Sequence, residues 1–350
     1  MATPTLGHLD PAFLALVDEI NDGLRQLFGT TNARTFPVSG TGSAGMETAL
    51  ANLLEPGDTF VVGVNGVFGG RMAECARRLG AEVVTVEEEW GRVIPPERLL
   101  EVLEAHPEAK ALAVVHAETS TGVEQPLDEL DEALRHRDTL FVVDAVTSLG
   151  GIPVDVDARS IDVCFSGTQK CLGVPPGLAP ITFSEAAIQR IQARESPTST
   201  WYMDVELIGG YLGAERRYHH TAPINLLYGL HEGLQAIQEE GLEARFRRHE
   251  DAGRYLRKAL EERGFRFFAQ EGHRLPQLTS VHLPEDREEG PLRARLRDEH
   301  HIEVGGGLGP AQGKIWRIGL MGHGATRETA DTFLSAVDEV LAEAPVTGRT

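Results

Sequence analysis

The sequence predicts an α/β fold in which a large domain holds a mainly parallel sheet flanked by helices. Nearly all-apolar runs rich in β-branched residues, such as 111–116 and 140–143, are typical of strands buried on both faces. Segments with apolar residues at helical spacing separate these runs, which favours parallel strands joined by helices. The last third mixes shorter strands with helices. We therefore expect a large domain over residues 1–240 and a smaller α+β C-terminal domain over 241–350.

The first element is expected to be a helix that begins just after Asp10. An Asp before the first turn caps free N–H groups, and Pro11 suits the first helical position. Apolar residues then recur at helical spacing until Gly29, which is a natural stop.

The expected strands are short and lie in two groups along the chain. In order they are 35–38, 59–64, 82–86, 111–116, 140–143, 163–166, 179–183, 278–282 and 315–320. Helices are expected after the first strand through Leu54, after the second up to Gly80, over most of 223–263, and at the end of the chain. The Ser196–Thr200 stretch, rich in Ser, Thr and Pro, predicts a loop.

The overall charge argues against some kinds of partner. Lys and Arg number 33 against 53 Asp and Glu, so the net charge is −20. Such an acidic chain repels phosphate backbones and anionic lipid, and we expect neither nucleic-acid nor membrane binding. No apolar run reaches the roughly 18 residues of a membrane span. The start of the chain lacks a secretory pattern, and the three cysteines form no CxxC motif, which favours a cytoplasmic protein.

A glycine-rich turn lies between the first expected strand and the next helix. It reads Ser-Gly-Thr-Gly-Ser and contains Thr41, Gly42 and Ser43. Glycines let backbone N–H groups face a ligand, and a helix start favours anions, so the turn suits a phosphate. An ordinary tight turn would look the same. The third glycine of a dinucleotide-binding motif and the lysine of a P-loop are both missing.

Three charged residues stand at or within apolar segments. Asp144 follows a buried strand, Lys170 lies in an apolar loop after another strand, and Arg317 lies within a late strand. Each could be a structural residue with an ionic partner or a solvated one. Together with the glycine-rich turn, however, they match what pyridoxal phosphate requires: a phosphate cup, an acid for the ring nitrogen and a lysine for the Schiff base. The arginine would add a clamp for a substrate carboxylate.

Several stretches carry a resemblance to a known family. They are SGTGSAGMETALANLLEPGD, NGVFGGR, HAETSTGVEQPL, VVDAVTSLGG, DVCFSGTQKCLGVPPG, YHHTAPINLLYGL and VGGGLGPAQGKIWRIGL, which run from about residue 36 to about 327. In order and spacing they resemble the alanine–glyoxylate and serine–pyruvate aminotransferases, which are class V pyridoxal-phosphate enzymes of fold type I.

The resemblance implies a role for each site residue. Lys170 would hold the cofactor covalently, and Asp144 would hold the proton of its ring nitrogen. The expected phosphate contacts are Thr41, Gly42, Ser43 and Gln169. Phe68 would stack on the ring, with Thr119 and Val146 beside it, and Arg317 would bind the substrate carboxylate. Tyr218 and Thr221 would reach the phosphate of the partner subunit, which implies a homodimer.

The implied reaction transfers an amino group from alanine or serine to glyoxylate or pyruvate. Ureidoglycine or aminoethylphosphonate could replace the donor, and a related lyase or desulfurase is a further alternative. An NAD-dependent oxidoreductase or a non-catalytic binding protein would be the alternatives from other classes. No metal is expected, because adjacent pairs such as His219-His220 do not face one point.

Overall fold

A seven-stranded sheet is the centre of the fold. The structure is a computed structural model that describes residues 4–284 and 287–343, and within these ranges the sheet has the order β1-β9-β8-β7-β4-β2-β3. The bounds of its strands are β1 (Arg34–Ser39), β2 (Thr59–Val64), β3 (Glu82–Glu87), β4 (Ala111–Val115), β7 (Leu140–Asp144), β8 (Val163–Phe165) and β9 (Leu178–Phe183). Among these described strands β9 is antiparallel to both of its neighbours, β1 and β8, and all the other neighbouring pairs are parallel.

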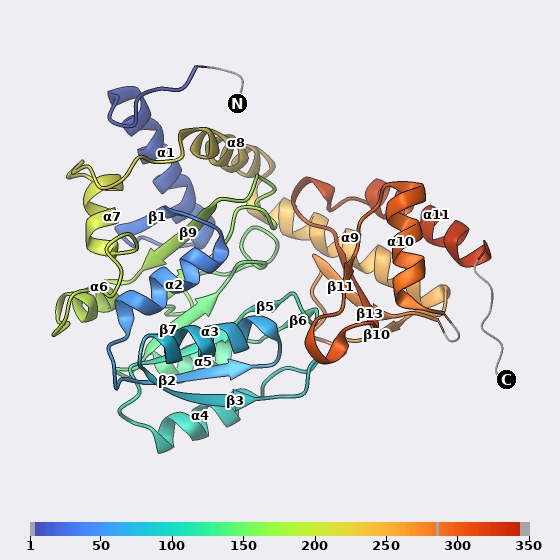
Figure 1. Ribbon diagram of the computed structural model, residues 1–350, viewed down its shortest axis with the longest axis horizontal. Helices are drawn as coiled ribbons and strands as arrows, with labels where there is room; N and C mark the ends of the chain where they lie inside the picture. The colour runs from blue at the N-terminus through green and yellow to red at the C-terminus, as the bar shows by residue number, and fades with distance from the viewer. Residues whose placement is uncertain (1–3, 285–286, 344–350) are drawn as a thin grey trace.

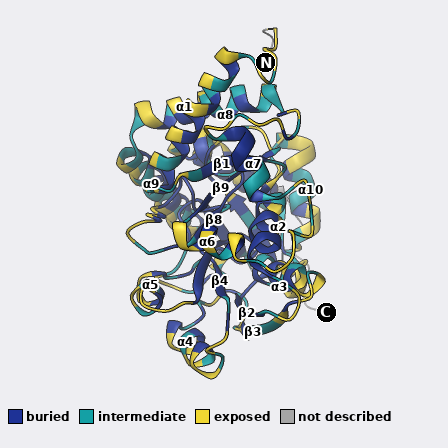
Figure 2. Cartoon of the chain, turned by 90° about the vertical axis from the view of Figure 1, so that its left-hand side faces the viewer, coloured by how far each residue is buried: buried dark blue, intermediate teal, exposed yellow. Residues whose placement is uncertain are grey.

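Helices cover both faces of this sheet. They are α1 (Pro11–Phe28), α2 (Gly42–Leu53), α3 (Val67–Arg78), α4 (Pro96–Ala105), α5 (Asp128–Leu134), α6 (Glu185–Gln192), α7 (Val205–Leu212) and α8 (Ile224–Glu240). Figure 2 shows α2 and α3 on one side of the strands and α5 on the other. The expected mainly parallel α/β architecture is confirmed, and it brings the carboxyl ends of the parallel strands to one edge.

The first helix follows its sequence signals closely. The Asp10 side chain accepts a hydrogen bond from the N–H of Ala12, and Pro11 occupies the first turn. Gly29 ends the helix in the left-handed region, with φ of 67°. Local signals therefore determine both ends of α1.

A second, smaller sheet follows in sequence. In order along the chain, the described elements of this part are α9 (Leu242–Glu262), β10 (Arg266–Phe267), β11 (Leu278–His282), α10 (Glu289–His300), β12 (Gly305–Gly306), β13 (Ile315–Gly319) and α11 (Arg327–Glu343). The sheet order is β10-β11-β13-β12, with antiparallel pairing throughout the described strands. Figure 1 shows this sheet with α9, α10 and α11 to the right of the large one. The domain boundary at residues 240 and 241 stays a prediction, and it falls at the turn between α8 and α9.

Each sheet has its own buried apolar core. The larger core includes the wholly buried central strands β4 and β7, and the smaller one surrounds Trp316 of β13. A short hairpin of β5 (Ala117–Glu118) and β6 (Val123–Glu124) lies between them and pairs with the second part of the chain at Arg274. None of the described helices is both long enough and apolar enough to cross a bilayer.

Candidate active site

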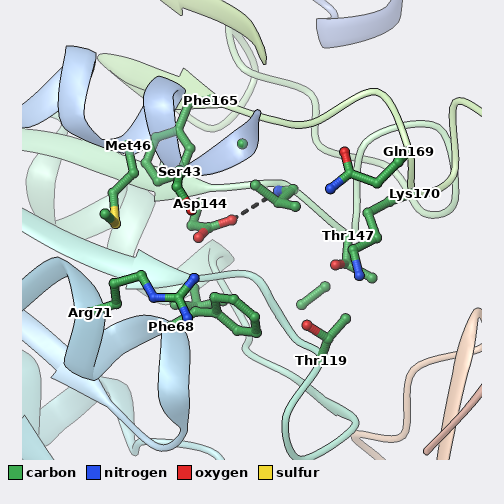
Figure 3. Close-up of a pocket in the computed structure, with 14 residues that line it drawn as sticks. Ser43, Met46, Phe68, Arg71, Thr119, Asp144, Thr147, Phe165, Gln169 and Lys170 are labelled. Atoms are coloured by element: carbon green, nitrogen blue, oxygen red, sulfur yellow. Dashed lines mark hydrogen bonds between the residues drawn. The ribbon is translucent and has the colours of Figure 1, made fainter. Parts of the chain in front are cut away.

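A cavity opens at the carboxyl ends of the parallel strands, and eight of the predicted residues line it. Gly42 and Ser43 come from the start of α2, Phe68 from α3 and Thr119 from the segment after β5. Asp144 and Val146 come from the end of β7, and Gln169 and Lys170 from the loop after β8. Figure 3 shows Asp144 and Lys170 on opposite sides of the cavity, with Phe68 and Thr119 along one wall.

Asp144 is a buried acid whose carboxylate faces the cavity. It is the last residue of β7 and only 5% exposed. The N–H of Val146 donates to Oδ1 over 2.9 Å, and no other described residue donates to the side chain. Burial raises the pKa of Asp144 to about 7, and the nearby charge of Glu118 adds to this effect. An acid with this pKa can exchange a proton with a basic ring nitrogen near neutral pH.

Lys170 lies in a loop whose backbone is firmly held. Thr168 donates its hydroxyl to the carbonyl of Pro175 over 2.7 Å, and Gly173 N–H donates to the carbonyl of Lys170 over 3.0 Å. Burial lowers the pKa of the Lys170 amine, and the positive charge of Arg317 lowers it further. Both effects favour the neutral amine, which is the nucleophilic and proton-accepting form.

The start of α2 forms the floor of the cavity near Gly42. The N-terminal residue Thr41 makes no side-chain capping bond, so N–H groups at this helix start remain available to an anion. A Cβ at Gly42 would lie 2.9 Å from Cγ2 of Val146, closer than real contacts allow. Glycine is required here because the helix start approaches the end of β7 so closely.

Phe68 and Arg71 lie on the same face of α3. The guanidinium carbon of Arg71 lies 5.0 Å from the centroid of the Phe68 ring, within the range of a cation–π contact. Arg71 also lines the cavity and lowers the pKa of Asp144 against the effect of burial. This wall therefore presents an aromatic ring and a positive charge side by side (Figure 3).

Arg317 comes from β13 of the smaller sheet and reaches the edge of the site. Its Nε donates to the carbonyl of Gly306 over 2.7 Å, and its Nη1 donates to the carbonyl of Thr119 over 3.2 Å. No carboxylate in the described part of the chain forms an ion pair with it, although its side chain is half-buried. A half-buried guanidinium without an ionic partner is suited to an anionic ligand.

Comparison with known proteins relates the chain to aminotransferases. The family model for class-V aminotransferases matches residues 3–323. Alanine–glyoxylate aminotransferase from Rattus norvegicus is 40% identical over 344 residues, which cover 97% of this chain and 83% of the relative. (S)-ureidoglycine–glyoxylate transaminase from Bacillus subtilis is 38% identical over 360 residues, with coverage of 97% and 86%. Among solved structures, alanine–glyoxylate aminotransferase from Nostoc sp. superimposes with a TM-score of 0.95 at 47% identity, over 97% of this chain and 90% of that one.

The chain belongs to the class V aminotransferase family. It is therefore an enzyme of the aminotransferase type, and the predicted family and fold are confirmed.

Class V aminotransferases are pyridoxal-phosphate enzymes, and the cavity contains groups that suit this cofactor. The amine of Lys170 and the buried carboxylate of Asp144 face the same space. The uncapped start of α2 offers N–H donors next to them, at a point where glycine leaves room. An amine, a buried acid and an anion-binding helix start are the three parts that the cofactor requires, so the residues present fit it.

Four predicted residues of this aminotransferase lie outside the cavity lining: Arg317, which reaches only its edge, and Thr41, Tyr218 and Thr221. Thr41 is exposed at the start of α2. Tyr218 is 58% exposed, Thr221 is exposed as well, and their hydroxyl oxygens lie 3.4 Å apart. The structure brings this pair together on the surface and not into the cavity of the same chain.

Six residues that line the cavity were not among the predicted site residues: Met46, Arg71, Val115, Ala117, Thr147 and Phe165. Arg71 follows Phe68 by three positions, so helical spacing could have placed both on one face. Met46 has the same relation to Ser43 on α2.

Proposed function

We propose that this aminotransferase moves an amino group from a small amino acid, alanine or serine, to a 2-oxo acid, glyoxylate or pyruvate. The observation that supports it most is the nearness of two basic groups, the Lys170 amine and the Arg317 guanidinium. One can act on the α-carbon while the other takes the carboxylate of the same substrate. The relatives named alanine–glyoxylate aminotransferase support glyoxylate as the acceptor.

The proposed cofactor contacts follow from the cavity walls. The N–H groups and hydroxyls at the start of α2, from Thr41 to Ser43, would hold the phosphate together with the Gln169 side chain. Phe68 and Val146 would hold the flat ring between them. Bound in this way, pyridoxal phosphate supplies an electron sink for the pair of electrons left when the α-proton departs.

Asp144 and Lys170 would each handle a different proton of the reaction. The free Oδ2 of Asp144 would accept a hydrogen bond from the ring nitrogen and keep a proton there, because a buried carboxylate strongly favours a charged partner. The Lys170 Nζ, whose neutral form is favoured by its surroundings, would take the proton from the α-carbon of the substrate and then donate it to the carbon of the cofactor.

Arg317 would orient the substrate. Its backbone contacts to Gly306 and Thr119 hold the guanidinium plane, and a carboxylate would bind to the remaining N–H groups as a fork. Fixing the carboxylate would turn the α-carbon of the substrate toward Lys170.

We also propose a cytoplasmic homodimer. The exposed Tyr218 and Thr221 have no role in the cavity of their own chain, which suits a contact with the phosphate bound to a second copy. The three cysteines are all free thiols, two of them buried, which suits a reducing compartment.

The test is the visible spectrum of the protein loaded with cofactor. Addition of L-alanine should bleach the band of the bound cofactor, and glyoxylate should restore it. If alanine and serine leave the band unchanged while (S)-ureidoglycine bleaches it, the amino donor is (S)-ureidoglycine and not alanine or serine. The Bacillus subtilis relative, an (S)-ureidoglycine–glyoxylate transaminase, favours this second donor. A band that responds to none of these donors would reject both.

A further inference from the structure

Glu118 is a fully buried acid that the proposed mechanism does not use. It ends β5 and is 0% exposed. Its Oε1 accepts hydrogen bonds from Ser120, from the N–H over 3.0 Å and from the hydroxyl over 2.6 Å. Its Oε2 accepts from the N–H of Phe68 over 3.0 Å. Burial raises the pKa of Glu118, but all of these partners donate, and their hydrogen bonds lower that pKa and favour the carboxylate.

On one side Glu118 caps the helix that carries Phe68. The helix α3 has Gly66 before its first turn, which offers no side-chain cap. The carboxylate of Glu118 and the hydroxyl of Ser120 replace it, the latter accepting from the N–H of Val67 over 3.0 Å. A Cβ at Gly66 would lie 2.4 Å from Cγ and Cδ of Glu118, so the close approach requires glycine. The start of α3 therefore rests directly on this carboxylate.

On the other side the same segment holds Arg317. The next residue, Thr119, accepts a hydrogen bond at its carbonyl from Arg317 Nη1. The negative charge of Glu118 also favours the guanidinium and opposes the effect of burial, which lowers the pKa of Arg317. The α3 wall of the cavity and the β13 arginine at its edge thus meet at residues 118 and 119.

We propose that Glu118 is a positioning residue that fixes the position of Phe68 relative to Arg317. The cofactor ring and the substrate carboxylate are then held at a fixed separation. The inference rests on the roles proposed above for Phe68 and Arg317. A group that only capped α3 would affect folding, whereas a positioning group also affects what the cavity binds.

The matched variants are Glu118→Gln and Glu55→Gln. Glu55 accepts from the N–H and hydroxyl of Ser196 over 2.9 and 2.6 Å, the same pattern that Glu118 makes with Ser120, but at a partly exposed site outside the cavity lining. In each variant the amide turns an acceptor into a donor facing N–H groups. Any difference between the effects of the two substitutions therefore comes from where the glutamate lies in the fold and not from the type of hydrogen bond that is lost.

Three measurements on the full-length protein test the proposal. Titration of the cofactor-free enzyme with pyridoxal phosphate should give binding about 10-fold weaker for Glu118→Gln, on the scale expected for loss of a charge-assisted hydrogen bond. The visible circular dichroism per bound cofactor should fall, because the ring is no longer held in one orientation. KM for the amino donor should rise more than kcat falls. Glu55→Gln should change none of these.

The proposal is overturned if Glu118→Gln lowers Tm but leaves cofactor affinity, dichroism and KM as in the wild type. If that variant does not fold, Ser120→Ala serves instead, since it removes one donor from Glu118 and the acceptor for Val67. It should shift the same quantities in the same direction by about 3-fold, and unchanged values overturn the proposal. The titration and dichroism need no substrate, so a wild type that ignores alanine would reject the proposed donor without deciding on Glu118.

Discussion

The guanidinium of Arg245 donates a 2.6 Å hydrogen bond to the carbonyl of Cys171, the residue that follows Lys170. The same side chain, only 1% exposed, donates to the carbonyl of Gly150 over 3.0 Å and pairs with Glu240 over 2.8 Å. Arg245 belongs to α9, so a helix of the second part of the chain directly supports the lysine loop of the first.

Replacing Arg245 with Gln is expected to destabilise the fold by about 3–5 kcal/mol, because buried carbonyls and part of the Glu240 charge lose their partner. Urea unfolding measures the loss. Arg247→Gln is the control, since its side chain is 71% exposed and its ion pair within the described residues is with exposed Glu243 over 3.5 Å. Equal effects of the two substitutions would contradict the importance of the buried contacts.

Lys170→Ala is expected to abolish transamination, with a loss of at least about four orders of magnitude, because no other amine is proposed to move the α-proton. Single-turnover bleaching with alanine measures it. Tm should stay close to that of the wild type, since the Lys170 side chain is only half-buried. Substantial remaining turnover would remove Lys170 from its assigned role.

The raised pKa of Asp144 predicts how the stability of the cofactor-free protein depends on pH. The folded state binds the proton more tightly than the unfolded state, whose acid titrates near 3.8, while the folded pKa is about 7. Stability is therefore greatest below pH 4 as far as this group is concerned, and it is lost as the pH rises to about 7. Asp144→Asn should be more stable than the wild type at pH 8, with the difference vanishing near pH 4 in urea titrations. A difference that does not change with pH would contradict the burial effect.

Arg317→Gln is expected to raise KM for alanine by about 100-fold, because a charged fork to the carboxylate is lost. Cofactor affinity should change little. An amine without a carboxylate, such as ethylamine, should react equally slowly with both enzymes. If Arg317→Gln still prefers alanine over ethylamine by the same factor as the wild type, the substrate carboxylate is bound by a residue other than Arg317.

The proposed partner contact of Tyr218 can be tested with mixed dimers. Tyr218→Ala and Lys170→Ala chains, each impaired alone, should regain activity when co-expressed, because one site of the hybrid then contains neither substitution. The control mixes Lys170→Ala with Asp144→Ala, two residues that line the same cavity of one chain. That pair should regain nothing. Absence of recovery in the first mixture would place Tyr218 outside the partner's site.

The parts of the fold that depend on local pattern could be predicted from the sequence. The apolar runs of β4 and β7 are wholly buried, and the acid that ends β7 does face a cavity. The direction of β9 could not be inferred, because an apolar strand buried on both faces reads the same in either direction. The contacts of Glu118 and Arg71 also depend on how α3 meets the β5 segment, which no single stretch of sequence contains.

The hydrogen bond from Arg317 to Thr119 joins residues 198 positions apart in the chain. During synthesis the residues proposed to hold the cofactor, up to Lys170, leave the ribosome well before β13 does. A domain folds as its own residues emerge, so the large sheet and its cavity can form first. The anchor for the substrate is then added last, and a nascent chain can meet its cofactor before it is able to select an amino acid.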